Sequence, residues 1–378
     1  MEAIESPRVL VADDQQDVLE ALRLLLKSAG CEPDCVRSIP DLRARLDAQA
    51  YDLVLMDLNY ARDTTSGREG LDMLAELHAR DHLLPIIVMT GWGTIDTAVE
   101  AMRRGARTFV EKPWNNAALA RTVQQELGEA ASQRQADALA ARELQDARRV
   151  QRALLPATLP SVAGFELAAL WQPALVCGGD CYDVVHIGHR RFGISIADVA
   201  GKGMPAALLM SSIQALVRTF TGDGNGPADV AGRVNRALCG NAGLSTMVTF
   251  FHAVVDGEAG TITFCNAGHN PPILVRATGA IERLATGGLV LGIAEDAAYD
   301  QHRAALRAGD RLLLFTDGLT EAERADGELF EDERLVALAV QHRHLPARQL
   351  VDRVFAEVRQ FTNGPFRDDA TALAVAVA

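Results

Sequence analysis

Residues 178–210 constrain the fold of this chain most, because they place two aspartates beside glycines at the ends of apolar segments. Residues 192–197 have the composition of a strand and are followed directly by Asp198. A glycine-rich turn comes next, and Pro205 suits the first turn of a helix that we expect over 206–217. That helix is apolar almost all round, so it should be buried. A carboxylate at such a strand end is poorly placed for stability and well placed to hold a metal ion.

Further aspartates lie at the edges of apolar segments later in the chain. Asp317 follows the segment 311–315, and the pair Asp368-Asp369 precedes the final apolar run. If these sites converge with Asp180 and Asp198, each pair of carboxylates about 4 Å apart repels by about 4 kcal/mol at an effective dielectric constant near 20. Cations must then neutralise the cluster, and oxygen ligands favour Mg²⁺ or Mn²⁺. Two such ions about 3.5–4 Å apart can activate water for in-line attack on a phosphate.

Five ordered stretches make the region from about 151 to 378 resemble the PPM-type (protein phosphatase 2C-like) serine/threonine phosphatases, in their bacterial SpoIIE/RsbU branch. They are Gly-Gly-Asp-Cys-Tyr-Asp at 178–183, Ala-Asp-Val-Ala-Gly-Lys-Gly at 197–203, Asn-Ala-Gly-His-Asn-Pro-Pro at 266–272, Thr-Asp-Gly at 316–318 and Asp-Asp-Ala-Thr at 368–371. A single Asp-Gly after a strand is usually a turn. The ordered set is far more specific than any one of its members.

The resemblance implies an α+β sandwich of antiparallel strands flanked by helices, with two Mn²⁺ or Mg²⁺ ions at one edge. It implies that Asp180 and Asp198 bridge the metals with help from the Val199 carbonyl. Asp317 and Asp368 would hold the second metal, and Asp369 ranks below Asp368 as a ligand. By the same resemblance the catalytic residues are Asp180, Asp198, Asp317 and Asp368.

Three nearby positions receive other interpretations. Many eukaryotic relatives have a histidine where this chain has Ala200, so the group that protonates the leaving serine or threonine oxygen is unassigned. Asp183 is expected to cap or orient rather than bind metal. His269 is expected to be a hydrogen-bonded turn residue rather than a catalytic one.

Residues 8 to about 127 alternate apolar strands with helical segments. Strands are expected at 8–12, 52–56, 85–89 and 107–110, and a helix over 17–28. This alternation predicts an α/β fold with a parallel, doubly wound sheet. The polar residues just past the strand ends of such a sheet share one crevice, and here they are Asp13, Asp14, Asp57, Thr90 and Lys112.

This region resembles a response-regulator receiver domain, on the residues Asp13-Asp14, Asp57, Thr90, Phe109 and Lys112-Pro113. The resemblance implies that a sensor histidine kinase phosphorylates Asp57 and that Lys112 pairs with the phosphoryl oxygens. Mg²⁺ would be held by Asp13, Asp14, Asp57 and the Asn59 carbonyl, and Thr90 and Phe109 would relay the change. The segment 59–70 is longer than the usual loop after the acceptor and lacks its usual proline. It could alter kinase choice or the lifetime of the phosphate.

A helical linker should join the two regions, because no proline or glycine occurs between Gly128 and Pro156. We expect a receiver domain at 7–127, the linker at 128–156 and the phosphatase domain at 157–378. Near-heptad apolar positions indicate either a weak parallel coiled coil, and hence a homodimer, or a solvated spacer. They are Leu139, Leu144, Ala147, Val150 and Leu154.

Composition narrows the classes of function. The net charge of −13 argues against nucleic acid as the main partner, and no apolar run is long enough to span a bilayer. The six cysteines lack zinc-site spacing, which indicates reduced thiols in a cytoplasmic protein.

The resulting hypothesis is a two-component output protein that dephosphorylates a partner, which the resemblance suggests is a phosphorylated STAS-type anti-sigma antagonist. The direction of control by Asp57 is open. Two rivals are a degenerate phosphatase fold that only binds a phosphoprotein and a DNA-binding response regulator.

Overall fold

The structure is a computed structural model, and it describes residues 6–59, 68–91, 95–240 and 247–378. The chain divides into two compact units, Met1–Ala141 and Arg142–Ala378. The expected long loop after the phosphoacceptor falls largely at residues 60–67, which lie outside the described residues.

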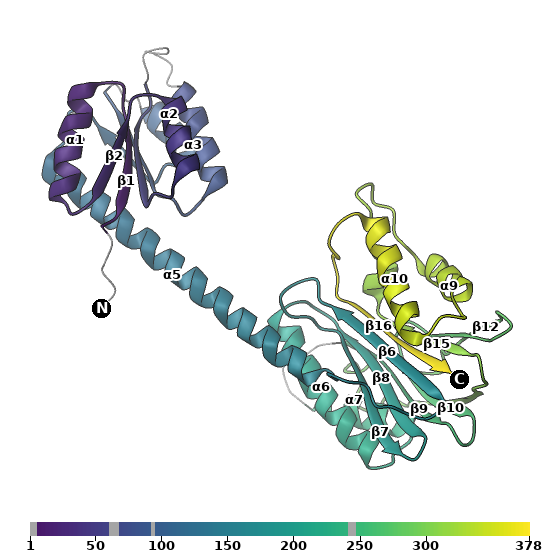
Figure 1. The fold of residues 1–378 in the computed structure, drawn as a ribbon. Helices are drawn as coiled ribbons and strands as arrows, with labels where there is room; N and C mark the ends of the chain where they lie inside the picture. The colour runs from purple at the N-terminus through teal and green to yellow at the C-terminus, as the bar shows by residue number, and fades with distance from the viewer. Residues whose placement is uncertain (1–5, 60–67, 92–94, 241–246) are drawn as a thin grey trace. The chain divides into compact units, whose positions relative to one another are not determined.

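The first unit is built on a five-stranded parallel sheet with the order β2-β1-β3-β4-β5. Its strands are β1 (Arg8–Ala12), β2 (Glu32–Val36), β3 (Leu53–Asp57), β4 (Ile86–Thr90) and β5 (Thr108–Glu111). The helices are α1 (Gln16–Ser28), α2 (Ile39–Ala48), α3 (Arg68–Arg80), α4 (Ile95–Arg103) and the start of α5 (Asn116–Leu154). The predicted doubly wound α/β fold is confirmed, and Figure 1 shows α1 and α2–α3 on opposite sides of the sheet.

Alternation along the strands explains why both faces of this sheet are buried. Val9 and Val11 of β1 pack against apolar residues of α1 and α5 on one face of the sheet. Leu10 packs on the other face, in the apolar cluster that α2 and α3 cover. The sequence patterns did not predict β2, because it contains Pro33 and Asp34. Its place at the edge of the sheet accounts for the proline, since an edge strand has ladder positions that need no N–H donor.

The second unit contains two sheets with mostly antiparallel pairing. One has the order β13-β10-β9-β8-β7, with β14 also paired to β10, and the other has the order β12-β11-β15-β16-β6. The strands of the first sheet are β7 (Cys181–Gly188), β8 (Arg191–Val199), β9 (Val248–Asp256), β10 (Thr261–Ala267), β13 (Gly287–Gly288) and β14 (His302–Ala305). Those of the second are β6 (Phe165–Gln172), β11 (Ile273–Val275), β12 (Ile281–Arg283), β15 (Arg311–Phe315) and β16 (Ala370–Val377). The expected sandwich is confirmed.

Helices flank both sheets of the second unit (Figure 1). They are α6 (Met204–Gly222), α7 (Pro227–Cys239), the short α8 (Asp317–Thr320), α9 (Asp332–Gln341) and α10 (Ala347–Thr362). The prediction that the helix after Pro205 is buried all round is wrong. α6 buries the face that carries Met210 and Ile213 against β7, β8 and α7, but Leu208 on the opposite face is 65% exposed.

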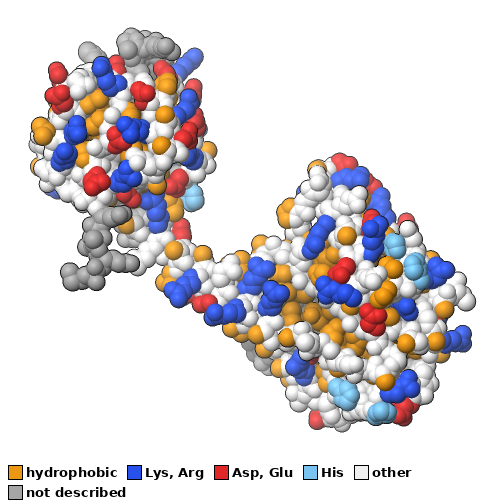
Figure 2. Space-filling model, viewed as in Figure 1, with side chains coloured by type: hydrophobic (Ala, Val, Ile, Leu, Met, Phe, Trp, Pro, Cys, Tyr) orange, Lys and Arg blue, Asp and Glu red, His pale blue; other side chains and the backbone are white. Residues whose placement is uncertain are grey.

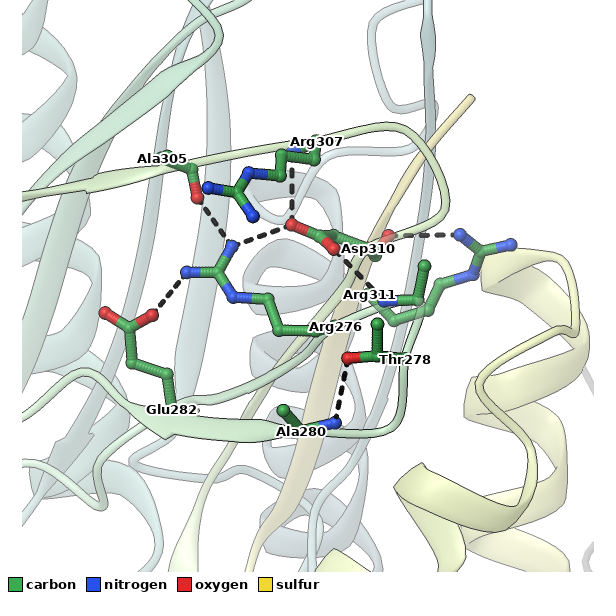
Figure 3. A network of polar contacts seen from close by, with 9 residues as sticks. Arg276, Thr278, Ala280, Glu282, Ala305, Arg307, Asp310 and Arg311 are labelled. Carbon is green, nitrogen blue, oxygen red and sulfur yellow. Dashed lines mark hydrogen bonds and ion pairs between the residues drawn. The ribbon is translucent and has the colours of Figure 1, made fainter.

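The beginning of β15 is fixed by a buried carboxylate. Asp310 is 1% exposed and accepts hydrogen bonds from the Arg276 guanidinium at 2.7 Å and from the backbone N–H of Arg307 at 3.0 Å. Arg276 also donates to the Ala305 carbonyl at 2.7 Å, so one arginine ties β11 to β14 and to the turn before β15 (Figure 3). Because the opposite end of β15 leads directly to Asp317, this network holds the strand that carries a predicted site residue.

Two expectations from composition can be compared with the structure. The six cysteines are free thiols. None of the helices in the described ranges combines the length and apolar character needed to cross a bilayer.

Two candidate acidic sites

The first site lies at the carboxyl ends of β1 and β3. Carboxylate oxygens of Asp13, Asp14 and Asp57 all lie within 4.8 Å of one another. Asp13 and Asp57 are buried, and Lys112 brings its Nζ to 2.5 Å from Asp13 Oδ2 and 3.0 Å from Asp57 Oδ2. The strand order of the sheet therefore brings these predicted residues together.

Burial and the lysine act on the pKa of Asp57 in opposite directions. Burial raises the pKa of Asp57, and the nearby charge of Lys112 only partly offsets the increase. Burial alone lowers the pKa of Lys112, but its hydrogen bond to Asp13 and the charge of Asp57 raise it overall. The buried Oδ1 of Asp57 has no hydrogen-bond partner within the described residues, so this oxygen is available to a cation or a phosphoryl group.

The other predicted receiver residues surround this cluster. The Asn59 side-chain amide lies 3.5 Å from the hydroxyl of Thr90, which is buried at the end of β4. Phe109 is partly buried on β5 and packs against the apolar cluster under α2 and α3. An all-oxygen donor set beside a cation fits Mg²⁺ together with an anion.

The second site is formed where four segments of the second unit meet. Asp180 directly precedes β7, Asp198 lies at the end of β8, Asp317 begins α8 and Asp368 precedes β16. Asp180 is 1% exposed, and its Oδ2 accepts hydrogen bonds from the hydroxyls of Thr316 at 2.7 Å and Thr371 at 2.6 Å. Its Oδ1 is buried without a partner among the described residues, which suits a ligand to a cation.

Burial and mutual repulsion raise the pKa values of the carboxylates at this site. Burial and the charge of Asp198 raise the pKa of Asp180 well above its ordinary value. Burial, followed by the charges of Asp317 and Asp368, raises the pKa of Asp198 to about 7. Burial and the charges of Glu321 and Asp368 raise the pKa of Asp317 to about 6. Four converging carboxylates with this donor chemistry fit Mg²⁺ or Mn²⁺.

Two glycines allow the backbone to approach the acidic residues. A Cβ at Gly179 would lie 2.8 Å from the Val199 carbonyl oxygen, the oxygen predicted to assist in metal binding. A Cβ at Gly318 would lie 2.0 Å from the carbonyl oxygen of Asp369. Side chains at these positions would force the segments apart, which explains the Gly-Asp and Asp-Gly pairs in the sequence.

The two adjacent aspartates before β16 have different surroundings. Asp368 is partly exposed and forms an ion pair with Lys202 at 2.9 Å. Asp369 is buried, and its two carboxylate oxygens accept backbone N–H groups of Ala174 at 2.8 Å and Gly179 at 2.6 Å. These contacts give Asp369 a clear function in holding the loop before Asp180.

The structure adds two residues that the sequence patterns did not single out. Glu321, one helical turn after Asp317, contributes negative charge to both Asp198 and Asp317. Gln151, near the end of α5, is buried and contacts Gly178 through both ends of its amide. Its Nε2 donates to the Gly178 carbonyl at 2.5 Å, and its Oε1 accepts the Gly178 N–H at 3.1 Å.

Two further residues have surroundings that suit structural functions. Asp183 is buried and paired with Arg218, with Nη2 of the arginine 2.9 Å from Oδ1. His269 is buried, with Nδ1 2.7 Å from the Thr249 hydroxyl, and its backbone N–H donates to the Asn266 side chain. Burial lowers the pKa of His269 to about 4, which keeps the imidazole neutral.

Comparison with known proteins identifies a family for each of the two units. The family model for Stage II sporulation protein E (SpoIIE) matches residues 188–378, and that for the response regulator receiver domain matches residues 9–124. Phosphoserine phosphatase RsbU of Bacillus subtilis is 32% identical over 232 residues, which cover 61% of this chain and 69% of that protein.

Solved structures show the same phosphatase fold. The RsbU and RsbW domains of Rv1364c from Mycobacterium tuberculosis match with a TM-score of 0.53 and 28% identity, over 59% of this chain and 63% of that one. The SiaA-PP2C domain of Pseudomonas aeruginosa matches with a TM-score of 0.58 and 24% identity, over 64% of this chain and 99% of that one. This chain therefore belongs to the SpoIIE family of metal-dependent phosphatases and carries an N-terminal response-regulator receiver domain.

Proposed function

We propose that this chain is a cytoplasmic two-component response regulator whose output is the hydrolysis of phosphoserine or phosphothreonine on a partner protein. The observation that carries the proposal is the convergence of Asp180, Asp198, Asp317 and Asp368, with pKa values raised by burial and mutual repulsion. The similarity to a phosphoserine phosphatase supports this class of substrate. The six free thiols are in keeping with a reducing compartment.

The residues of the second site have distinct functions in this proposal. Asp180, Asp198 and the Val199 carbonyl, together with Asp317 and Asp368, would hold two Mn²⁺ or Mg²⁺ ions. When bound, such ions supply Lewis acidity to a phosphoryl oxygen and lower the pKa of water. The hydroxyls of Thr316 and Thr371 favour the ionised form of Asp180 and orient it. Asp369 ranks below the other ligands, because its oxygens already accept two backbone N–H groups.

Control is proposed to begin at Asp57, phosphorylated by a sensor histidine kinase. The first site would hold Mg²⁺ through Asp13, Asp14, Asp57 and the Asn59 carbonyl, while Lys112 pairs with the phosphoryl oxygens. Phosphorylation adds about −1.5 to −2 units of charge at pH 7. Thr90 and Phe109 then respond to that charge, and they relay the resulting conformational change to α5.

The helix α5 is the proposed connection between signal and output. Leu139, Val150 and Leu154 are 57%, 60% and 40% exposed, an apolar pattern that supports pairing with a second copy in a homodimer. Near the end of the same helix, Gln151 holds the loop that precedes Asp180. The proposed substrate is a phosphorylated STAS-type anti-sigma antagonist, in line with the likeness to the RsbU and RsbW domains of Rv1364c.

The test is hydrolysis of p-nitrophenyl phosphate in the presence of Mn²⁺. Wild type, Asp198→Asn and Asp57→Asn are compared, each with and without beryllofluoride as a mimic of the acyl phosphate. We expect wild type to be active, Asp198→Asn to be inactive, and beryllofluoride to change the rate only when Asp57 is present. If no condition gives turnover that depends on Asp198, the domain is instead a module that binds phosphoproteins, and Mn²⁺ titration would show no tight site.

A further inference from the structure

A groove of about 950 Å³ runs along the free edge of β6 in the second unit. Its lining includes the five consecutive residues 169–173, together with residues of α5 and α10. Successive side chains of a strand point to opposite faces, so a groove lined by five consecutive residues faces the edge of the strand. β6 is the last strand of its sheet, and within the described residues its only partner strand is β16, apart from a single bridge between Phe165 and Val162 at its start. Its outer N–H and C=O groups are therefore available to another strand.

The groove is strongly basic although the chain is acidic overall. Its lining contains five arginines and no acidic residue, in a chain with a net charge of −13. Within the described residues, Arg148 and Arg152 of α5 lie one helical turn apart and form no ion pair, while Arg348 on the other wall pairs with Asp352. The face of the second unit seen in Figure 2 shows Lys and Arg side chains beside a stretch of hydrophobic surface.

The spacing of the arginines matches an extended chain. Arg348 and Arg359 lie on α10, and eleven residues of helix correspond to about 16 Å at 1.5 Å per residue. Five extended residues at about 3.3 Å each cover the same length, and the groove is lined by the last four residues of β6 and by Pro173, which follows them. A compact anion would contact only part of this row, whereas a strand with alternating carboxylates would meet arginines on both walls.

One end of the groove lies beside the second acidic site. Trp171 pairs in register with Thr371, whose hydroxyl donates to Asp180 at 2.6 Å. Pro173, which directly follows β6 and lines the groove, precedes Ala174, whose N–H donates to Asp369. A segment bound along β6 would therefore lead toward the carboxylates.

We propose that this groove binds an extended acidic segment of the phosphoprotein substrate, which adds as a strand to the edge of β6. Main-chain hydrogen bonds to β6 supply affinity, and the arginines select for carboxylates. The proposal rests on the proposed phosphatase function for the identity of the partner, but the groove itself can be tested without catalysis.

The binding test uses the full chain in metal-free buffer and a fluorescein-labelled nine-residue peptide that alternates Glu and Val. We expect binding that weakens with added salt, and a loss of affinity of at least tenfold in Arg152→Glu and in Arg348→Glu. Arg353→Glu is the matched control, because Arg353 also loses an i,i+4 ion pair on α10 but does not line the groove. It should change the affinity less than twofold. N-methylation of alternate peptide amides should weaken binding at least tenfold if a strand is added.

Several results would overturn the proposal. They are absence of peptide binding, equal effects of Arg348→Glu and Arg353→Glu, or unchanged affinity of the N-methylated peptide. Competition by ATP as strong as that by unlabelled peptide would indicate a site for compact anions instead. Loss of dimerisation in Arg348→Glu, measured by sedimentation, without peptide binding to wild type would assign the groove to a second copy of the chain.

A kinetic experiment then connects the groove to the substrate. Two phosphoserine peptides are compared, one with the Glu-Val segment and one with a Lys-Val segment. Wild type should favour the acidic peptide at least tenfold in kcat/KM, and Arg348→Glu should remove that preference. Hydrolysis of both peptides at equal kcat/KM by wild type would overturn the docking proposal and leave the phosphatase function intact. If the peptide binds but neither phosphoserine peptide is hydrolysed, the phosphatase function is overturned and the docking proposal is left intact.

Discussion

At the edge of the first unit, three carboxylates gather with oxygens within 4.8 Å of one another, whereas the acidic residues of the second unit come from four separate segments. The first edge contains its own cation. Lys112, whose side chain is 13% exposed, contacts both Asp13 and Asp57. At the second edge the side chain of Lys202 is 48% exposed, forms an ion pair with Asp368 and donates a hydrogen bond to the Arg367 carbonyl.

This difference indicates how strongly each edge depends on ions that it binds from solution. Lys112 offsets part of the negative charge of Asp13 and Asp57 at the first edge, in keeping with the proposal that this site takes up one Mg²⁺ ion and one phosphoryl group. The carboxylates of the second edge have pKa values raised to about 7 for Asp198 and about 6 for Asp317. The exposed Lys202 offsets only part of their charge, so we expect the second edge to depend on added cations.

The largest expected effect is loss of hydrolysis when a carboxylate of the second edge is neutralised. Asp180→Asn should lower Mn²⁺-dependent hydrolysis of p-nitrophenyl phosphate by about 10³-fold or more, because a ligand worth several kcal/mol of charge stabilisation is lost. Asp183→Asn is the control, since Asp183 is equally buried but paired with Arg218. It should retain most of the activity of the folded protein. Equal losses in both variants would show that burial, not metal binding, explains the importance of Asp180.

Removing the lysine from each edge compares the two directly. Lys112→Met leaves buried carboxylates without their cation and should cost about 3–5 kcal/mol of local stability. Lys202→Met removes a largely exposed ion pair and should cost less than about 1 kcal/mol. Hydrogen exchange of β1 and β3 in one variant, and of β8 and β16 in the other, measures these effects. Mg²⁺ should restore part of the stability of Lys112→Met. Similar losses of stability in Lys112→Met and Lys202→Met would contradict the expected difference between the two edges.

The sequence predicts the acidic residues of both edges because each lies at the end of an apolar run. Asp57 ends a strand whose other residues are Leu, Val and Met. Asp317 lies two residues after a strand that contains only Leu and Phe after Arg311, so both segments are readily predicted as buried strands. β2 escapes prediction, since its sequence Glu-Pro-Asp-Cys-Val lacks an apolar pattern and the strand is defined by its pairing with β1. The assignment of individual metal ligands stays a prediction.

Residues whose importance comes from distant contacts are harder to find. Glu321 could have been identified, because it lies four residues after Asp317, directly after the short helix that Asp317 begins. Gln151 could not, since its partner Gly178 is 27 residues away and neither residue has a charge that signals the contact. Leu208 is apolar yet exposed, so the apolar composition of α6 led to the wrong prediction that the whole helix is buried.

Gln151 offers a smaller and more specific test of how α5 acts on the second edge. Gln151→Ala should raise the Mn²⁺ concentration for half-maximal hydrolysis by about thirtyfold, because the loop before Asp180 loses both hydrogen bonds and about 1 kcal/mol is expected for each. Gln214→Ala is the matched control. It removes a bond to the Leu154 carbonyl at 2.9 Å, which anchors the same helix end without touching the loop. Equal shifts in both variants would mean that anchoring of the helix alone is decisive.

The smallest expected effect is a dependence of thermal stability on pH and Mn²⁺. Because Asp198 and Asp317 have raised pKa values in the folded chain, the folded state binds more protons than the unfolded state between about pH 4 and pH 7. The metal-free chain should therefore lose stability as the pH rises through this range, with a shift in Tm of about 2–4 °C for each kcal/mol. Asp198→Asn should reduce the loss, measured by thermal unfolding in EDTA.

Mn²⁺ should oppose this loss most strongly near pH 7, where the carboxylates are ionised and can bind it. Near pH 5 protons compete with the metal, so the same Mn²⁺ concentration should raise Tm less. A pH dependence that Mn²⁺ left unchanged would mean that Asp198 and Asp317 do not bind the ion. The expected contrast between the two edges in their need for added cations would then be wrong.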